Sequence, residues 1–292
     1  MTSLRAQFIC ELNIRGRAER TIQAYVARVA ALAKHYGRSP DRISDEEIRS
    51  WLEHLRVERK LSGSSLNVAV NAVRNFQEWV LHRPREQCVR GIPKCRRIAT
   101  RVEVYAQSEI AAILAAAGAG RDGMLLTVIY ACGLRRDEAR LLQVGDLDAP
   151  RGQLRVRRGK GGKPRVLPMT PALFGDMRVY WKAERSGRPG HDSPWLFQGV
   201  RPGEPMSPSL ALHVYGRAVQ RAGIRRKGGL HTLRHSFATH LLEAGVEITL
   251  VQRLLGHASL TTTARYLHVT HGRVEKLAAG AAPLDLLAAL RR

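Results

Sequence analysis

The sequence predicts a mainly α-helical protein with a small antiparallel sheet, divided into two domains. Residues 1–82 contain four helical patterns separated by turn signals. Periodicity then vanishes over 83–104, where Arg, Pro and Lys accumulate as in an interdomain linker. Within the mostly helical remainder, 105–292, residues 152–169 read as a two-stranded hairpin. A chain of 292 residues with 44% apolar content can supply a packed core to each domain.

Two helical patterns of the first domain carry specific signals. The segment "SDEEIRSWLEHLRVERK" places Ser44 and Glu47 at capping-box spacing. The segment "SGSSLNVAVNAVRNFQEWVLH" has apolar residues at helical spacing, and such a stripe more often packs in a core than binds a partner. The stripe consists of Leu66, Val70, Val73, Phe76, Trp79 and Val80. Residues 1–82 are therefore expected to form a small helical domain with basic outer faces, and the basic linker 83–104 can follow a phosphate backbone.

The second domain should begin with the helices "QSEIAAILAAAGAG" and "RDGMLLTVIYACG". In the hairpin that follows, Leu154, Val156 and Val166 alternate on either side of a glycine-rich turn. Residues 185–208 form a loop-rich insert in an otherwise helical stretch. The final "PLDLLAALRR" is expected to be a short apolar helix, which either packs on its own domain or docks on a neighbouring protomer.

The chain is strongly basic throughout, with 48 Lys+Arg against 25 Asp+Glu and a formal net charge of +23. Residues 1–100 contain 19 basic and 10 acidic residues, and residues 101–292 contain 29 basic and 15 acidic residues. A generally solvated basic surface is the simpler explanation, but an excess in both halves suits a protein that wraps a duplex. The N-terminal sequence lacks an apolar run of the signal-peptide type, and no segment reaches the length of a membrane span. A cytoplasmic protein is expected.

The cysteines indicate no disulfide framework and no paired metal motif. Cys10, Cys88, Cys95 and Cys132 are widely spaced, so reduced thiols are the expected state. Cys88 and Cys95 flank part of the basic linker and could bind zinc, but no second pair lies near them in the sequence.

The segment "ACGLRRDEARLL" brings an arginine and a carboxylate together. Gly133 can end one helix, which leaves Arg135 at the start of the next and Glu138 three residues further on the same face. Glu138 could then orient the Arg135 guanidinium. Taken alone the pair is a weak signal, because most such pairs are surface salt bridges of about 0.2–0.5 kcal/mol.

In "HTLRHSFATH", His231 and Arg234 share a helical face, with His235 at the next matching position. Two histidines four residues apart also suggest a zinc site. The helical metalloprotease pattern requires a glutamate directly after the first histidine, and Thr232 stands there instead. Arg234 between the histidines would also repel a dication. A metal site is therefore not expected.

The segment "LLGHASLTTTARYLHVT" places His257 in a glycine-marked turn and Tyr266 on the helix expected to follow. A tyrosine, with a pKa near ~10, is a poor nucleophile unless charge developing on it and on its target is stabilised. Two arginine forks can clamp the non-bridging oxygens of a phosphodiester, histidines can bind those oxygens or move a proton, and a hairpin lysine can protonate the leaving oxygen. Such a set can transfer a phosphoryl group without a metal.

Together these segments resemble the tyrosine recombinases of the phage integrase and Xer type. The matching pieces are "GLRRDEARLL", "GKGGKPRVLP", "HTLRHSFATHLLEAGV" and "VQRLLGHASLTTTARYLHV", in the family's order and spacing. The resemblance covers most of 105–270. Residues 1–82 resemble the family's SAM-like core-binding domain more loosely. The family resemblance implies a DNA-binding domain at 1–82, a basic linker at 83–104 and a catalytic domain at 105–292.

The resemblance also implies a role for each matching residue. Arg135 and Arg234 would hold the scissile phosphate, Lys160 would be the general acid, and Tyr266 the nucleophile. His231 and His257 would bind the phosphate and assist proton transfer, with His231 a candidate for deprotonating the tyrosine, and Glu138 would support them. The reaction would pass through a 3′-phosphotyrosyl link and a free 5′-hydroxyl, with no cofactor, metal or ATP. His235 and His240 have no place in this set and are expected in packing or on a helix surface.

Further basic residues around the hairpin are expected to contact DNA phosphates or remain solvated. They are Arg155, Arg157, Arg158, Lys163 and Arg165. Lys163 lies close enough to Lys160 to compete with it for the general-acid assignment. The implied partners are double-stranded DNA recombination sites and a homotetramer assembled on them, with or without a partner recombinase, and no membrane is involved.

Three other functions compete with this reading. A type IB topoisomerase-like enzyme would nick and reseal one duplex with a similar set of residues. A DNA-binding regulator would keep the fold and act by occupancy alone. A metal-dependent nuclease or transposase would lose its activity in EDTA. No further module is expected before the helical domain, which favours a recombinase that acts on core sites.

Overall fold

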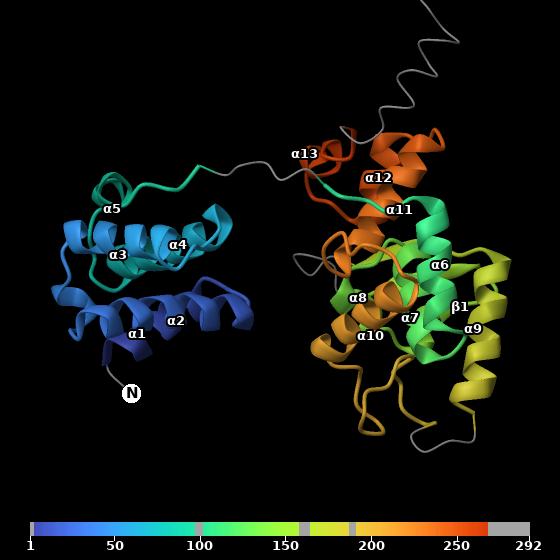
Figure 1. Ribbon diagram of the computed structural model, residues 1–292. Coiled ribbons are helices and arrows are strands. Elements are labelled where there is room, and N and C mark those ends of the chain that lie inside the picture. The colour runs from blue at the N-terminus through green and yellow to red at the C-terminus, as the bar shows by residue number, and fades with distance from the viewer. Residues whose placement is uncertain (1–2, 97–101, 158–163, 187–190, 268–292) are drawn as a thin grey trace, which may run out of the picture. The chain divides into compact units, whose positions relative to one another are not determined.

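The computed structural model describes residues 3–96, 102–157, 164–186 and 191–267, and the chain divides into two compact units, Met1–Thr100 and Arg101–Arg292 (Figure 1). The described residues of the first unit form helices joined by short turns. These are α1 (Ser3–Ile14), α2 (Glu19–Tyr36), the 3-10 turn η1 (Pro40–Arg42), α3 (Asp45–Val57), α4 (Gly63–Trp79) and α5 (Arg85–Gly91).

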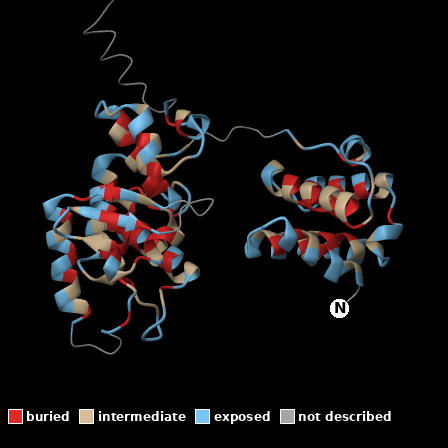
Figure 2. Cartoon of the chain, turned by 180° about the vertical axis from the view of Figure 1, so that it is seen from behind, coloured by how far each residue is buried: buried red, intermediate tan, exposed pale blue. Residues whose placement is uncertain are grey.

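Helix α4 lies at the centre of the first unit, because its apolar side chains join two core clusters. One cluster is shared mainly with α3, and the other with α1 and α2. Red buried positions accordingly line the facing sides of these helices in Figure 2. The predicted stripe on α4 is buried except at Trp79, which is partly exposed and covered by the Arg15 guanidinium 4.3 Å from its ring centre. The capping box is also confirmed: the Glu47 N–H donates to Ser44 Oγ at 3.2 Å, and the Ser44 N–H to Glu47 Oε2 at 2.9 Å.

The first unit continues into the segment expected to be a linker. Helix α5 packs on α3 and α4 and buries Cys88, and Ile92 just beyond it is fully buried. Asn67 on α4 exchanges two hydrogen bonds of 2.9 Å with the backbone of Cys95. A helix of seven residues that buries one side chain has too little periodicity to recognise in the sequence. The unit therefore extends past residue 82, and Cys88 serves packing.

The second unit is a helical layer around one central helix, with a small sheet beside it. Helix α7 contacts α6, α8, α9, α10 and α11 and contributes much of the main core. The elements are α6 (Gln107–Ala117), α7 (Arg121–Ala131), α8 (Arg136–Arg140), η2 (Val144–Asp146), β1 (Leu147–Asp148), β2 (Gln153–Val156), β3 (Arg165–Pro168), α9 (Pro171–Glu184), α10 (Pro208–Arg221), α11 (His231–Glu243), α12 (Ile248–Leu255) and α13 (Leu260–Ala264).

The sheet is antiparallel with strand order β1-β2-β3, so the predicted hairpin is confirmed and a short third strand is added. In β3 the buried side chain is Leu167 and not its neighbour Val166. Leu154 pairs directly with Leu167, and both are buried, whereas Val166 is 53% exposed. Residues directly opposite in an antiparallel pair share a face, so the register turns Val166 to the other side. The described part of the insert, 191–207, forms loops with two isolated bridges, as expected.

The C-terminal elements form a separate apolar cluster next to the main core. Helices α11 and α12 pack together (Figure 1). Tyr266, beyond α13, joins their apolar cluster and is 3% exposed. The expected helix "PLDLLAALRR" lies outside the described residues. Within the described residues no helix is both long and apolar enough to cross a bilayer.

Candidate active site

The turn after α7 places Arg135. The chain leaves the helix through Gly133 at φ +57°, and the Leu134 N–H donates back to the Ile129 carbonyl at 3.0 Å. Arg135 is the N-cap of α8, and its backbone N–H donates to Glu138 Oε2 at 2.8 Å. A side chain at position 133 would have no space, since its Cβ would lie 2.4 Å from Phe237 Cδ1. The expected helix end at Gly133 is confirmed and is tightly packed.

Gly133→Ala is expected to destabilise the protein by about 1–3 kcal/mol, because it adds both a clash and a strained positive φ. The Gly133 carbonyl also accepts a hydrogen bond from Arg234 Nη1 at 2.6 Å, so a backbone displacement at residue 133 would move the Arg234 guanidinium. Gly175→Ala in α9 is the matched control: no atom lies within 4 Å of its Cβ, and helix propensity predicts a gain in stability. Thermal unfolding of the two variants measures the difference, and equal melting temperatures would contradict the clash.

Glu138 is the hub of a buried charge cluster. Its carboxylate accepts from Arg135 Nη1 at 2.7 Å and from Arg165 Nη1 and Nη2 at 2.9 and 2.8 Å. Arg234 Nη1 lies 3.6 Å away, and the Glu138 side chain is 4% exposed. Burial alone would raise the pKa of Glu138, but the hydrogen bonds and charge of Arg165, then those of Arg135, outweigh it and lower the pKa to about 2. The carboxylate therefore holds the arginines in place, as a weak surface pair could not.

Glu138→Gln is expected to cost about 3–5 kcal/mol of stability, because it leaves three buried or half-buried guanidinium groups without their anion. The pKa of Glu138 is depressed in the folded state from an ordinary 4.5, so its contribution is present above that pH and is lost as the pH falls toward 2. Urea unfolding at several pH values should show the wild type losing this increment and the variant not. Glu204→Gln, at an exposed pair with Arg201, should change stability by less than about 0.5 kcal/mol.

Helix α11 presents three polar side chains from its first turns. His231 is the exposed first residue of the helix, whereas Arg234 is 3% exposed. Two backbone carbonyls fix the Arg234 guanidinium, that of Gly133 at 2.6 Å and that of Leu255 at 2.6 Å. Burial and then the charge of Arg135 lower the pKa of Arg234 to about 9, so the group stays cationic at neutral pH.

The turn after α12 brings His257 to the same place. Gly256 ends the helix in the left-handed conformation, φ +62°, as the sequence predicts. His257 Nε2 lies 3.1 Å from Arg234 Nη2, and its Nδ1 lies 2.9 Å from Thr263 Oγ1. Burial, followed by the charges of Arg234 and Arg135, lowers the pKa of His257 to about 4. The imidazole is therefore neutral at pH 7.

Tyr266 was expected on a helix, but it lies two residues beyond the end of α13. Its hydroxyl lies 2.9 Å from His235 Nδ1, and its ring stacks on His257 at 6.4 Å between centroids. Burial raises the pKa of Tyr266 even though Arg234, Arg265 and Arg135 oppose the effect. The phenol is neutral at pH 7 and needs a group to take its proton.

These side chains surround one cavity of about 350 Å³. The residues that line it include Val102, Arg135, His231, Arg234, His235, His257, Ala258, Ser259, Thr262, Arg265 and Tyr266. The described part of the lining holds no carboxylate and so suits an anion. Five of the six residues expected in catalysis therefore meet here, from segments more than a hundred residues apart. Lys160 lies outside the described residues.

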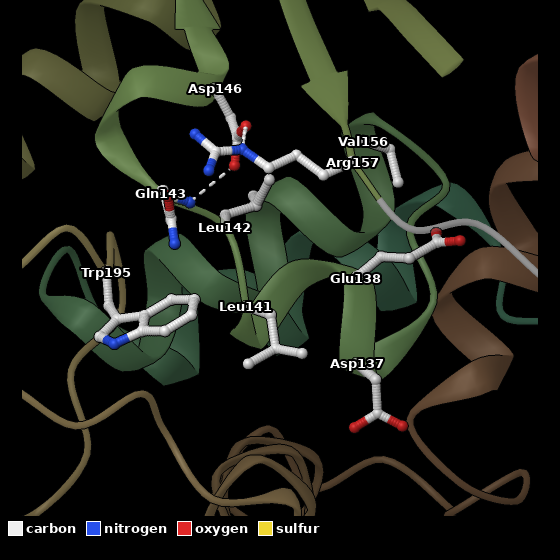
Figure 3. A pocket seen from close by; sticks show the side chains of 9 residues that line it. All are labelled: Asp137, Glu138, Leu141, Leu142, Gln143, Asp146, Val156, Arg157 and Trp195. Carbon is white, nitrogen blue, oxygen red and sulfur yellow. Dashed lines mark hydrogen bonds and ion pairs between the residues drawn. The ribbon is translucent and has the colours of Figure 1, made fainter. Parts of the chain in front are cut away.

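A second cavity, of about 270 Å³, opens beside α8 and β2, and its chemistry is the opposite (Figure 3). Among the described residues, Asp137, Glu138 and Asp146 line it together with one cation, Arg157, whose guanidinium lies against Asp146. Trp195 and Leu141 lie on the side away from this ion pair in Figure 3. Carboxylates outnumber cations in the described lining, so this cavity suits a phosphate less well than the cavity at Tyr266 does.

The basic residues expected to contact DNA differ in their surroundings. Arg155 is exposed on β2. Arg157 is half exposed and paired with Asp146. Arg165 is only 10% exposed, and its guanidinium donates hydrogen bonds to Glu138 and to the Leu254 carbonyl. It therefore makes internal contacts, and not the expected contact with a DNA phosphate. Arg158 and Lys163 lie outside the described residues. In sequence, nothing distinguishes Arg165 from its neighbours, because its partner is 27 residues away.

His235 is the site residue that the sequence reasoning missed. It was expected in packing or on a helix surface, yet it lines the cavity and touches the Tyr266 hydroxyl. The signal for it in the sequence was its place on the helical face of His231 and Arg234. His240 does serve packing: Nδ1 lies 2.8 Å from the Tyr130 hydroxyl and Nε2 2.9 Å from the Tyr105 carbonyl. Among the described residues no cluster of three His, Cys, Asp or Glu could hold a metal ion.

Comparison with known proteins agrees with this geometry. Residues 103–273 match the phage integrase family, and residues 4–87 match the phage integrase N-terminal SAM-like domain. A putative integrase/recombinase y4qK of Sinorhizobium fredii is 33% identical over 98% of this chain and 90% of its own length. Tyrosine recombinase XerC of Rhodospirillum centenum is 35% identical over 87% of this chain and 79% of its own.

Solved structures show the same architecture. The crystal structure of XerA recombinase matches with a TM-score of 0.56 at 25% identity, covering 96% of this chain and 98% of that one. The lambda integrase dimer bound to a core site, at 18% identity, shows the fold alone, with a TM-score of 0.70 over 89% of this chain and 96% of that one. The chain thus belongs to the phage integrase family and is a tyrosine site-specific recombinase of the integrase and Xer type.

Proposed function

We propose that this recombinase cleaves and rejoins DNA strands through a 3′-phosphotyrosyl intermediate formed on Tyr266. The observation that carries the proposal is the convergence of Tyr266, Arg135 and Arg234 on one cavity whose described lining residues include no carboxylate. A phosphodiester in that cavity would place its non-bridging oxygens between two guanidinium groups, which stabilise the extra charge of the transition state. Glu138 keeps both forks oriented before DNA arrives.

The chemistry would proceed in two exchanges that need no external energy source. The Tyr266 oxygen attacks phosphorus, the bond to the 5′-oxygen breaks, and that oxygen takes a proton from a general acid, assigned to Lys160 by the family resemblance. The free 5′-hydroxyl of a partner strand later attacks the phosphotyrosyl link and restores a phosphodiester. The bond energy is kept in the link, so neither ATP nor a metal is required.

The assembly would be four protomers on two recombination sites, since one tyrosine per protomer cuts one strand. Relatives in the solved structures are bound to DNA, among them XerH on its difH substrate and lambda integrase on a core site. The net charge of +23 supports duplex binding by both units. Residues 1–82 would contribute core-site binding.

The test is covalent capture. The full chain is incubated in EDTA, without ATP, with a library of nicked duplexes of randomised sequence. Protein-linked DNA is recovered after denaturation in detergent, sequenced, and digested with trypsin. The expected result is an enriched site and a nucleotide attached to the peptide "YLHVTHGR", which begins at Tyr266. Binding of the enriched duplexes without any linked DNA would favour a DNA-binding regulator, and dependence on a divalent metal would favour a nuclease.

A further inference from the structure

His235 contacts the atom that would attack the phosphate. Its Nδ1 lies 2.9 Å from the Tyr266 hydroxyl, and the two ring centroids are 5.6 Å apart. Within the described part of the chain, this is the hydroxyl's one hydrogen-bond partner. The contact joins α11 to the segment after α13, so it forms only when the fold brings these two elements together.

The direction of this hydrogen bond follows from the two groups. An imidazole nitrogen is a much stronger base than a phenol oxygen, so the Tyr266 O–H donates and Nδ1 accepts. The proton of the neutral His235 ring then lies on Nε2. Burial, followed by the nearby His231, Arg234 and Arg265, lowers the pKa of His235 to about 4, so Nδ1 is unprotonated at pH 7 and able to accept.

The other two histidines are less suited to take this proton. Arg234 Nη2 can only donate, so His257 Nε2 must accept, and the ring proton on Nδ1 is donated to Thr263 Oγ1. Both nitrogens of His257 are thus engaged with other groups. His231 is the exposed first residue of α11, and the hydroxyl's hydrogen bond goes instead to the residue one turn further along.

We propose that His235 is the general base that accepts the Tyr266 proton during cleavage and returns it during rejoining. As the tyrosine oxygen bonds to phosphorus, its proton moves to His235 Nδ1, and the 5′-oxygen leaves with a proton from the general acid. In the reverse step the 5′-hydroxyl attacks, and the departing tyrosine oxygen takes the proton back. The inference rests on the proposed nucleophilic role of Tyr266.

The surroundings of His235 explain why this base would act only with DNA in place. His231 and Arg234 face it from α11, Arg265 and Tyr266 from the segment after α13, and His257 from the turn after α12. The cations among them disfavour an imidazolium in the free protein. A bound phosphate brings negative charge next to Arg234 and offsets that penalty. Proton transfer is thereby coupled to occupation of the site.

His235→Asn separates proton transfer from positioning. Asparagine can offer a hydrogen-bond acceptor near the place of Nδ1 but cannot take a proton. The rate of covalent complex formation on an enriched nicked duplex should fall about 100-fold at neutral pH and then rise about tenfold per pH unit toward pH 9, while the wild-type rate stays flat. Added imidazole should restore part of the rate to His235→Ala. His213→Asn, an exposed histidine on α10, should behave as wild type.

Each outcome decides the matter. A His235→Asn rate equal to wild type, or a reduced rate with the same flat pH profile, would overturn the role as base. Duplex binding and thermal unfolding establish that the variant is folded. If the wild type itself links no DNA, the proposed function fails first and this inference falls with it. A measurement independent of DNA is the imidazole ¹⁵N NMR spectrum of the wild type, where His235 should carry its proton on Nε2 and His257 on Nδ1. The opposite tautomer at His235 would also overturn the inference.

Discussion

Tyr266→Phe is expected to abolish covalent attachment to DNA, a loss of at least about 10⁴-fold, because no other group can replace the attacking oxygen. The change removes one atom from a side chain that is 3% exposed, so the ring still fills its place beside His257 and the α11–α12 cluster. The hydrogen bond to His235 is lost, at a cost of about 1 kcal/mol in stability. Duplex binding should change by less than about twofold, since it depends on basic side chains and phosphates.

The matched control is Tyr180→Phe, which also removes a buried hydroxyl, one that donates to the Leu196 carbonyl at 3.0 Å. It should lose about the same stability and keep full covalent attachment. Denaturing gels of both variants on a nicked duplex give the comparison. A linked band of wild-type intensity with Tyr266→Phe would show that another residue is the nucleophile, and a loss of attachment in both variants would point to a folding defect.

Most helices could be predicted from the sequence because the signals that define them act between residues close together in the chain. The capping box at Ser44 and Glu47, the stripe on α4, and the glycines that end α7 and α12 each act within one or two helical turns. Helix α5 shows where this fails. It is stabilised by α3, α4 and the Asn67 contact to Cys95, 28 residues away, and not by a pattern of its own.

The site was predictable as a set of residue types but not as a set of contacts. Family resemblance supplied Arg135, Arg234, His257 and Tyr266, and the fold places them around one cavity. It could not supply Arg165, whose exposed or buried state depends on the carboxylate of Glu138 across the fold. Nor could it supply His235, because a contact across 31 residues depends on how the chain turns after α13.

Arg234→Lys is the second change expected to have a large effect, a loss of about 10³–10⁵-fold in covalent complex formation. Arg234 holds two backbone carbonyls and His257 with one planar fork while keeping its charge in the cavity. A lysine has a single ammonium on a flexible stem and cannot span these partners. The Gly133 and Leu255 carbonyls and His257 Nε2 would each lose a donor in a buried place.

The lysine would also lose charge. Burial and Arg135 lower the pKa of Arg234 to about 9, and the same surroundings would lower that of a lysine, which starts from a smaller ordinary value, toward neutrality. The variant should therefore recover part of its deficit as the pH is lowered, which a purely geometric defect would not do. Arg221→Lys, exposed at the end of α10, is the control and should keep the wild-type rate. Single-turnover rates between about pH 6 and pH 9 separate the two causes: a deficit that does not change with pH would assign the whole loss to the missing fork, and a wild-type rate would remove Arg234 from the phosphate site.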